Sequence, residues 1–188
     1  MLSPSQPPSS KAEQDKVWHL IKEERSALLV TVGEDGVLGA RPMGCLQKTF
    51  EGTLWFITFR RSGKLMEIRN DEQVLVAYAR PKKYEYVEIS GRARIVEDRV
   101  RMRELWREGL RVWFPKGLDD PLIALIEVEV ETARYWTRPA SLMAYAWLYA
   151  KARIAGKRAS TDAVADTDVV RFRSPAPQDR AEVVDPRQ

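Results

Sequence analysis

The chain has 188 residues, of which 31% are charged and 44% hydrophobic, and this composition is typical of a folded globular domain. The length predicts a single domain with its own core. The formal net charge is only +4, and the 31 Lys and Arg residues are spread among 27 Asp and Glu residues. This pattern argues against a nucleic-acid partner. No apolar run approaches the ~20 residues of a membrane-spanning helix, so no membrane partner is expected.

Cysteine usage bears on the cellular location. Cys45 is the single cysteine of the chain, so no intramolecular disulfide can form. The first residues lack the basic and then apolar pattern of a secretory signal. We therefore expect a cytoplasmic protein in which Cys45 is a buried and unreactive thiol. The single histidine, His19, has no partner at metal-ligand spacing, and no metal site is predicted.

The first half of the chain alternates short elements with turn signals. Residues 1–10 hold three prolines among polar residues and predict a flexible arm. Apolar residues at helical spacing follow and predict a helix to about residue 25. Glu34, Asp35 and Gly36 form a hairpin turn signal between two strands. The predicted strands up to residue 96, with a short helix over 64–69 between the third and fourth, are 27–32, 37–46, 53–59, 73–79 and 84–96.

The second half adds one long strand and two helices. Asp98 opens a helix that runs through Trp106, and a loop with two glycine or proline positions follows at residues 113–117. Alternating apolar and acidic residues predict a sixth strand over 122–136. An aromatic-rich helix is expected over 139–155, and residues 157–188 have no periodicity and predict a disordered tail.

Six strands joined by short turns, without βαβ alternation, predict a mainly β fold. We expect a six-stranded antiparallel barrel with flanking helices and a C-terminal helix, spanning residues 11–156. Gly91 lies inside the fifth strand and predicts a β-bulge or a close approach of another backbone.

Two neighbouring segments carry the clearest chemical signal. The strand over 53–59 ends at Thr58 and is followed by Ser62, Gly63 and Lys64 at a helix start, and Arg41 lies one hairpin earlier. Hydroxyls, helical N–H groups and cations together predict a phosphate-binding site. The alternative is that the two cations are ordinary surface charges and that the serine merely starts a helix. The spacing of Thr58 and Lys64 after an aromatic strand favours the phosphate.

The order of these motifs resembles the pyridoxamine 5′-phosphate oxidase-like FMN-binding split-barrel family, and in particular its general stress protein branch. The resemblance covers residues 11–136 and implies a homodimeric six-stranded split β-barrel that binds FMN, with FAD also possible. It places Tyr86 near the flavin, together with Trp136 contributed by the other subunit and Trp113 from the loop. The cofactor-binding residues implied as a whole are Arg41, Pro42, Met43, Gly44, Ile57, Thr58, Ser62, Lys64, Tyr86, Trp113 and Trp136.

The resemblance leaves three functional hypotheses. The first is a flavin-dependent oxidoreductase with a nicotinamide or small-molecule redox partner. The second is a non-catalytic FMN- or FAD-binding stress or sensor protein, and the third is a relative that binds deazaflavin or haem. The oxidase has Gln where Tyr86 stands here, and the chain continues differently after Trp136, so pyridoxamine 5′-phosphate oxidation is not expected. No residue stands out as a general acid or base, which suits a protein that positions a redox ring.

Overall fold

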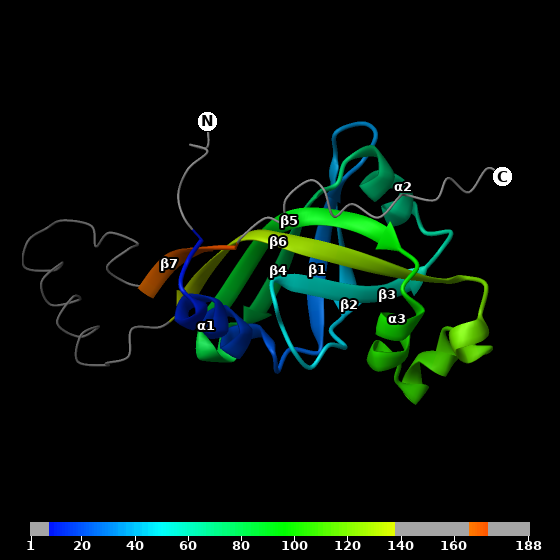
Figure 1. Ribbon diagram of the computed structural model, residues 1–188. Coiled ribbons are helices and arrows are strands. Elements are labelled where there is room, and N and C mark those ends of the chain that lie inside the picture. Colours follow the sequence, from blue (N-terminus) through cyan, green and yellow to red (C-terminus); the bar gives the residue numbers. More distant parts are fainter. Residues whose placement is uncertain (1–7, 138–165, 173–188) are drawn as a thin grey trace, which may run out of the picture.

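The computed structural model describes residues 8–137 and 166–172. These residues form three α-helices, three short 3-10 helices and one antiparallel sheet (Figure 1). In chain order the elements are α1 (Lys11–Ile21), β1 (Ser26–Val32), β2 (Leu38–Gly44), β3 (Thr53–Phe59), α2 (Gly63–Asn70), β4 (Gln73–Arg80), η1 (Pro81–Lys83), β5 (Glu85–Val96), α3 (Arg99–Leu105), η2 (Glu108–Val112), η3 (Gly117–Asp119), β6 (Ile123–Thr137) and β7 (Asp166–Arg171).

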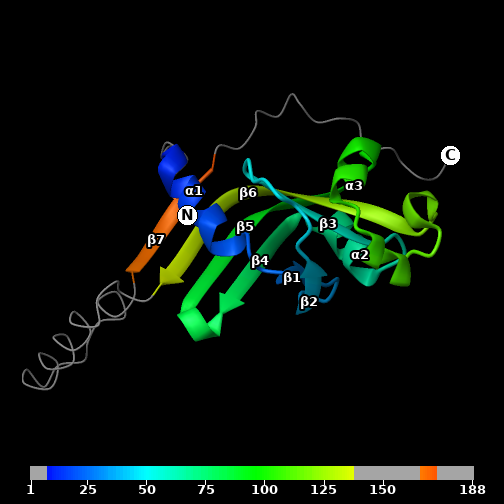
Figure 2. The same cartoon turned by 90° about the horizontal axis from the view of Figure 1, so that it is seen from below.

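The strands are ordered β2-β1-β4-β5-β6-β3 across the sheet, and every pairing is antiparallel. The long strand β6 pairs with β3 through its first half and with β7 through its last six residues. The sheet curls strongly, and β2 and β3, at the two ends of the order, come into contact (Figure 2). The predicted mainly β class is confirmed, as a curled half-barrel.

β7 is a correction to the sequence analysis, which placed residues 166–171 in a disordered tail. Val170 is fully buried against the core, and the ring of Phe172 packs edge-on against Phe50 at 5.5 Å between centroids. Two buried apolar side chains and a backbone ladder to β6 account for the order of this segment. The helix predicted over 139–155 lies outside the described residues, as do residues 1–7 and 173–188.

α1 ends four residues earlier than predicted. Its start is fixed by a capping box, in which Ser10 Oγ accepts a hydrogen bond from the Glu13 N–H and the Glu13 carboxylate accepts one from the Ser10 N–H. At the other end the Glu24 N–H bonds to the Ile21 carbonyl, and the chain turns into β1. The apolar face of α1 is buried on the sheet, as the periodicity predicted.

The bulge predicted at Gly91 is confirmed, because the β5–β6 register shifts between Ser90 and Gly91. A Cβ atom at residue 91 would lie 2.1 Å from the Glu129 carbonyl oxygen. Only glycine fits this close backbone approach.

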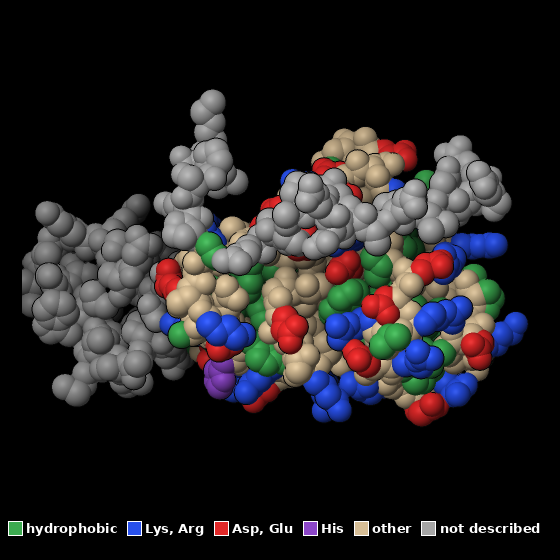
Figure 3. Space-filling view, viewed as in Figure 1, with side chains coloured by type: hydrophobic (Ala, Val, Ile, Leu, Met, Phe, Trp, Pro, Cys, Tyr) green, Lys and Arg blue, Asp and Glu red, His purple; other side chains and the backbone are tan. Residues whose placement is uncertain are grey.

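The core has two parts. The larger one lies between α1, α2 and the concave face of the sheet, and the smaller one lies where α3 and Phe114 cover Ile123 and Leu125 of β6. The first residues of β6 are therefore buried on both faces. Within the described residues, no helix has the length and apolar character needed to cross a membrane. Lys, Arg, Asp and Glu side chains are interspersed over the face seen in Figure 3.

Candidate functional site

The structure brings together four of the residues predicted to bind phosphate. We call Arg41, Thr58, Ser62 and Lys64 the anion seat. Arg41 comes from β2 and Thr58 from β3, the two ends of the strand order, and α2 begins directly after Ser62. The curl of the sheet is what allows side chains from its two ends to face the start of one helix.

Lys64 is tied to the end of β3. Its Nζ donates a hydrogen bond of 2.8 Å to Thr58 Oγ1, and Thr58 is itself buried. Partial burial lowers the pKa of Lys64, the positive charge of Arg41 lowers it further, and the carboxylate of Glu67 opposes both effects. Two cations are thus held close enough to repel each other, and an anion bound between them would relieve that repulsion.

Ser62 contributes the least expected feature of the seat. It occupies the N-cap position of α2 but makes no side-chain capping bond. Its Oγ is buried and has no hydrogen-bond partner anywhere in the described part of the chain. A buried hydroxyl without a partner is costly, so a ligand oxygen at this point would satisfy a group that the protein leaves unpaired.

Arg41 has two partners that sequence reasoning missed. Its Nη2 lies 2.8 Å from Glu67 Oε2, its Nη1 donates to Thr31 Oγ1, and the Thr31 hydroxyl donates to the same Glu67 oxygen. Thr31 comes from β1 and Glu67 from the second turn of α2. The only sequence signal for Glu67 is its position three residues after Lys64, which places both on one face of α2.

The remaining predicted residues of the two strands differ in what they can offer. Pro42 and Gly44 are exposed, whereas the Met43 side chain is buried in the larger core. Because β2 is an edge strand, its outward backbone groups are available to a ligand here, and at Pro42 that group is the carbonyl alone, since proline has no N–H. Ile57 faces the smaller core beside α3 and is only partly buried.

Trp113 lies in the predicted loop and is 63% exposed. Its neighbour Phe114 is buried and packs at 4.8 Å from the ring of Phe59, which anchors the loop to the end of β3. An indole held on an anchored loop can stack on a flat ligand at little entropic cost. The structure records no contact between Trp113 and the anion seat.

Tyr86 and Trp136 form a pair of their own. They lie directly opposite each other on β5 and β6, with Tyr86 40% exposed. Thr58 of the anion seat pairs with Ala124 near the start of β6, whereas Trp136 lies twelve residues further along the same strand. At about 3.3 Å per residue, the two positions are about 40 Å apart along β6. A single chain therefore does not bring this pair to the anion seat.

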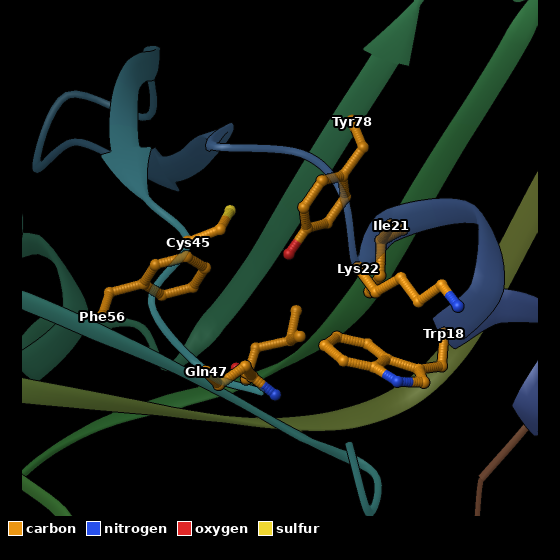
Figure 4. A pocket seen from close by; sticks show the side chains of 8 residues that line it. Trp18, Ile21, Lys22, Cys45, Gln47, Phe56 and Tyr78 are labelled. Atoms are coloured by element: carbon orange, nitrogen blue, oxygen red, sulfur yellow. The ribbon is translucent and has the colours of Figure 1, made fainter. Parts of the chain in front are cut away.

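Two hollows lie elsewhere. One of about 260 Å³ separates α3 from residues 47–55 and is lined by Trp55, over which Arg101 stacks. The other, about 20 Å³, lies between α1 and the sheet (Figure 4), where Trp18, Gln47 and Tyr78 surround it. Cys45 borders the smaller one.

The state of Cys45 agrees with the predicted unreactive thiol. Burial raises the pKa of Cys45 to about 11, although a hydrogen bond with Tyr78 acts in the opposite direction. A thiol with a raised pKa forms little of the reactive thiolate near neutral pH. Among the described residues, no group of three or more His, Cys, Asp and Glu side chains is arranged to hold a metal ion.

The anion seat has the chemistry of a phosphate-monoester site. It combines a guanidinium, an ammonium, an unpaired buried hydroxyl and the N-terminal end of α2, against one carboxylate. Two cations and one anion leave a net charge of +1. Such an arrangement can hold a dianionic phosphate through charge-assisted hydrogen bonds.

Comparison with known proteins bears on the family of the chain. A family model described as pyridoxamine 5′-phosphate oxidase like matches residues 12–160. Protein bli-3 of Neurospora crassa is 27% identical over 117 residues, which are 58% of this chain and 56% of that protein. The chain thus spans little more than half the length of that curated relative.

Two solved structures share the fold. The general stress FMN/FAD binding protein from the phytopathogen Xanthomonas citri is 28% identical, with a TM-score of 0.61 over 71% of this chain and 94% of that one. General Stress Protein 26 from Bacillus anthracis str. Sterne is also 28% identical, with a TM-score of 0.59 over 65% and 92% of the two chains. Each match spans almost the whole of the solved chain.

Proposed function

Since the chain belongs to the pyridoxamine 5′-phosphate oxidase-like family, as its motifs predicted, we propose that it is an FMN-binding split-barrel protein of the general stress type. The observation that carries the proposal is the buried and unpaired Ser62 hydroxyl at the start of α2, the helix whose Lys64 lies within the influence of Arg41. The relative from Xanthomonas citri is described as FMN/FAD binding, which supports a flavin as the ligand.

The anion seat would take the FMN phosphate. Arg41 and Lys64 supply charge-assisted hydrogen bonds, Ser62 supplies its hydroxyl, and the first N–H groups of α2 point toward the same anion. The phosphate of a monoester carries close to two negative charges at neutral pH. FMN is preferred over FAD because the seat is built for one terminal phosphate group, while FAD would need room for a second.

The flavin ring would lie between two subunits. The convex face of the sheet carries Leu28, which is 47% exposed and pairs with Pro42 and Ala77 on the same face. An exposed apolar sheet face of this kind favours burial against a second copy. In such a dimer the partner subunit's Tyr86 and the partner subunit's Trp136 would approach the seat that their own chain does not reach, and two-fold symmetry would make two equal sites.

Bound FMN would supply the redox chemistry itself, by accepting and passing on a hydride or single electrons. The protein's part would be to hold the phosphate in the anion seat and to present backbone groups of β2 to the polar edge of the ring. Exposed aromatic rings, such as Trp113, would exclude water from its face. We propose an oxidoreductase that draws on a nicotinamide or another small donor and works in the cytoplasm, where its single cysteine stays reduced.

The first experiment identifies the ligand. The purified protein is denatured, and the released small molecules are analysed by mass spectrometry and by absorbance. We expect FMN at about one per subunit. A colourless protein that also fails to bind added FMN or FAD would contradict the proposal. Consumption of NADH or NADPH by the FMN-loaded protein under air tests turnover, and no consumption with any donor would favour the non-catalytic flavin-binding protein.

A second experiment tests the subunit interface. Leu28→Glu places a charge on the convex face, and we expect light scattering to report a monomer that no longer retains FMN. Val100→Glu is the matched control, because Val100 is also an exposed apolar residue, at 59%, but lies on α3. If Leu28→Glu stays dimeric and keeps its flavin, this face is not the interface.

A further inference from the structure

A negative charge, Glu67, lies beside the anion seat. Glu67 Oε2 bonds to both Arg41 and Thr31, and its carboxylate also acts on Lys64, whose pKa it raises. A carboxylate in a site for a dianion is unexpected on charge alone, because it repels the ligand. It must either oppose phosphate binding or contribute to the seat in a way that outweighs the repulsion.

The contacts favour the second explanation. Arg41 Nη1 and Nη2 are both engaged, one by Thr31 and the other by Glu67, and the Thr31 hydroxyl closes the triangle by donating to Glu67. Both sides of the ion pair are about a quarter exposed or less, and Thr31 is fully buried. A planar guanidinium held at two nitrogens has a fixed orientation, so the directions of its remaining N–H groups are fixed as well.

The backbone of β2 is adapted to the same arrangement. A Cβ atom at residue 39 would lie 2.7 Å from Arg41 Nη2. The absence of a side chain at Gly39 therefore leaves the space that the guanidinium occupies when it reaches Glu67. Its φ is not in the left-handed region, so the need for glycine here arises from the side chain of Arg41 rather than from the turn.

Electrostatics explains why the guanidinium needs to be held. Arg41 and Lys64 are like charges that act on each other in a partly buried site. Without a carboxylate between them, Arg41 can reduce the repulsion by swinging its long side chain into water, since β2 is at the sheet edge. Glu67 removes that tendency by balancing one of the two charges.

We infer that Glu67, with Thr31 and the space at Gly39, is a positioning device that holds Arg41 in the anion seat before the ligand arrives. This inference rests on the proposed function, because the phosphate that binds in the seat is taken to be that of FMN. Glu67 does not bind the phosphate. Its contribution is to lower the ordering cost that Arg41 would otherwise bear on binding.

The experiment compares two ligands that share one ring. FMN and riboflavin differ only in the phosphate, so the ratio of their dissociation constants, measured by flavin fluorescence, isolates the anion seat. We expect Glu67→Ala to weaken FMN binding about tenfold and to change riboflavin binding less than about twofold. Gly39→Ala displaces the guanidinium without removing any charge, and we expect the same selective loss.

Other residues provide matched comparisons. Glu67→Gln keeps a hydrogen-bond acceptor but loses the charge, and we expect an intermediate loss of FMN affinity. Glu72→Ala removes an exposed carboxylate just after α2 and is expected to leave the affinities for both ligands unchanged.

If Glu67→Ala binds FMN more tightly, Glu67 opposes the phosphate and the inference is wrong. Equal weakening for both ligands also overturns it, because a general structural role would have that effect. Failure of the wild-type protein to bind FMN at all contradicts the proposed function instead.

Discussion

Two partly buried arginines of this protein have opposite surroundings. Arg80, at the end of β4, is 12% exposed and bonds to the carboxylates of Glu23, Glu24 and Glu85 and to the Leu20 carbonyl. Among the residues that the structure describes, Arg41 has one carboxylate partner, Glu67, and it acts on a second cation, Lys64, of the helix that begins after the unpaired Ser62 hydroxyl. The Arg80 cluster has more acceptors than its cation requires, whereas the anion seat has donors left over.

This difference separates a structural ion cluster from a binding site. A cation surrounded by carboxylates has no use for another anion, and Arg80 serves to join the end of α1 to the turn between β4 and β5. In a site with surplus donors, the unpaired donors raise the free energy of the free protein, and a bound ligand removes that cost. Substitutions in the two clusters should therefore affect different measurements.

The largest effect is expected from Arg80→Ala. Three carboxylates would lose the cation that they share, and within the described part of the chain only Glu23 would keep another, the exposed Lys83 at 3.8 Å. Removing one partner of a buried ion pair is strongly destabilising. Because the glutamates are partly exposed, we take the lower end of that range and expect a loss of about 3 kcal/mol in the free energy of unfolding. Urea denaturation followed by tryptophan fluorescence measures it.

Arg41→Ala is the matched control for that measurement. We expect it to change the free energy of unfolding by less than about 1 kcal/mol, because its cluster already contains a competing cation. The folded fraction of Arg80→Ala should still bind FMN. Equal destabilisation by both variants would remove the distinction between the two clusters.

The next largest effect is expected from Lys64→Ala, which should lower the affinity for FMN. Lys64 is a cation of the seat and is held by Thr58, so its loss should cost FMN binding about 1.5–3 kcal/mol, as for a charge-assisted contact. Fluorescence titration with FMN measures the change, and riboflavin serves as the phosphate-free reference. Lys82→Ala, at an exposed lysine of η1, should leave both affinities unchanged. An unchanged FMN affinity in Lys64→Ala would take Lys64 out of the phosphate site.

Part of the fold and part of the anion seat could be predicted from local features of the sequence. Local signals sufficed for the strands, for the bulge at Gly91 and for the grouping of Thr58, Ser62 and Lys64, because each lies within one hairpin or one strand-to-helix turn. Thr31 was missed although it lies in the same hairpin as Arg41, because a single threonine in a strand carries no signal of its own. Glu67 was missed because its contact with Arg41 depends on the packing of α2 against β1. β7 was missed for a similar reason. Its two buried side chains are too few for a periodic pattern, and the partner strand β6 is about 30 residues away in the chain.

Ser62→Ala should give a smaller effect with opposite signs in the two measurements. The free protein loses a buried hydroxyl that has no partner among the described residues, so its free energy of unfolding should stay the same or rise slightly. FMN binding should weaken by about 1 kcal/mol, because one hydrogen bond to the phosphate is lost.

The Ser10 hydroxyl provides the control for Ser62→Ala, since it caps α1. Ser10→Ala should cost about 1 kcal/mol of stability without affecting FMN. A destabilised Ser62→Ala would mean that its hydroxyl already has a structural partner.

The smallest expected effect is a pH dependence confined to the anion seat. The pKa of Lys64 lies below its usual 10.5 because of burial and the nearby Arg41. Above pH about 7 the FMN phosphate, whose second pKa is about 6, is a dianion and binds the protonated ammonium. In that range FMN affinity should be constant below the pKa of Lys64 in the free protein and should fall as the pH rises through it. The fall should therefore begin at a lower pH than for an ordinary lysine.

Riboflavin, titrated in parallel, corrects for ionisation of the ring, and Lys64→Arg keeps its charge throughout the alkaline range. We expect the ratio of FMN to riboflavin affinity to fall with pH in the wild type and to stay level in Lys64→Arg. The lysine beside the Arg80 cluster, Lys83, is exposed and contacts Glu23, so Arg80→Ala should leave the pH at which the ratio falls unchanged. If that pH moved with Arg80, the two clusters would be electrostatically coupled, and the division between structural cluster and binding site would not hold.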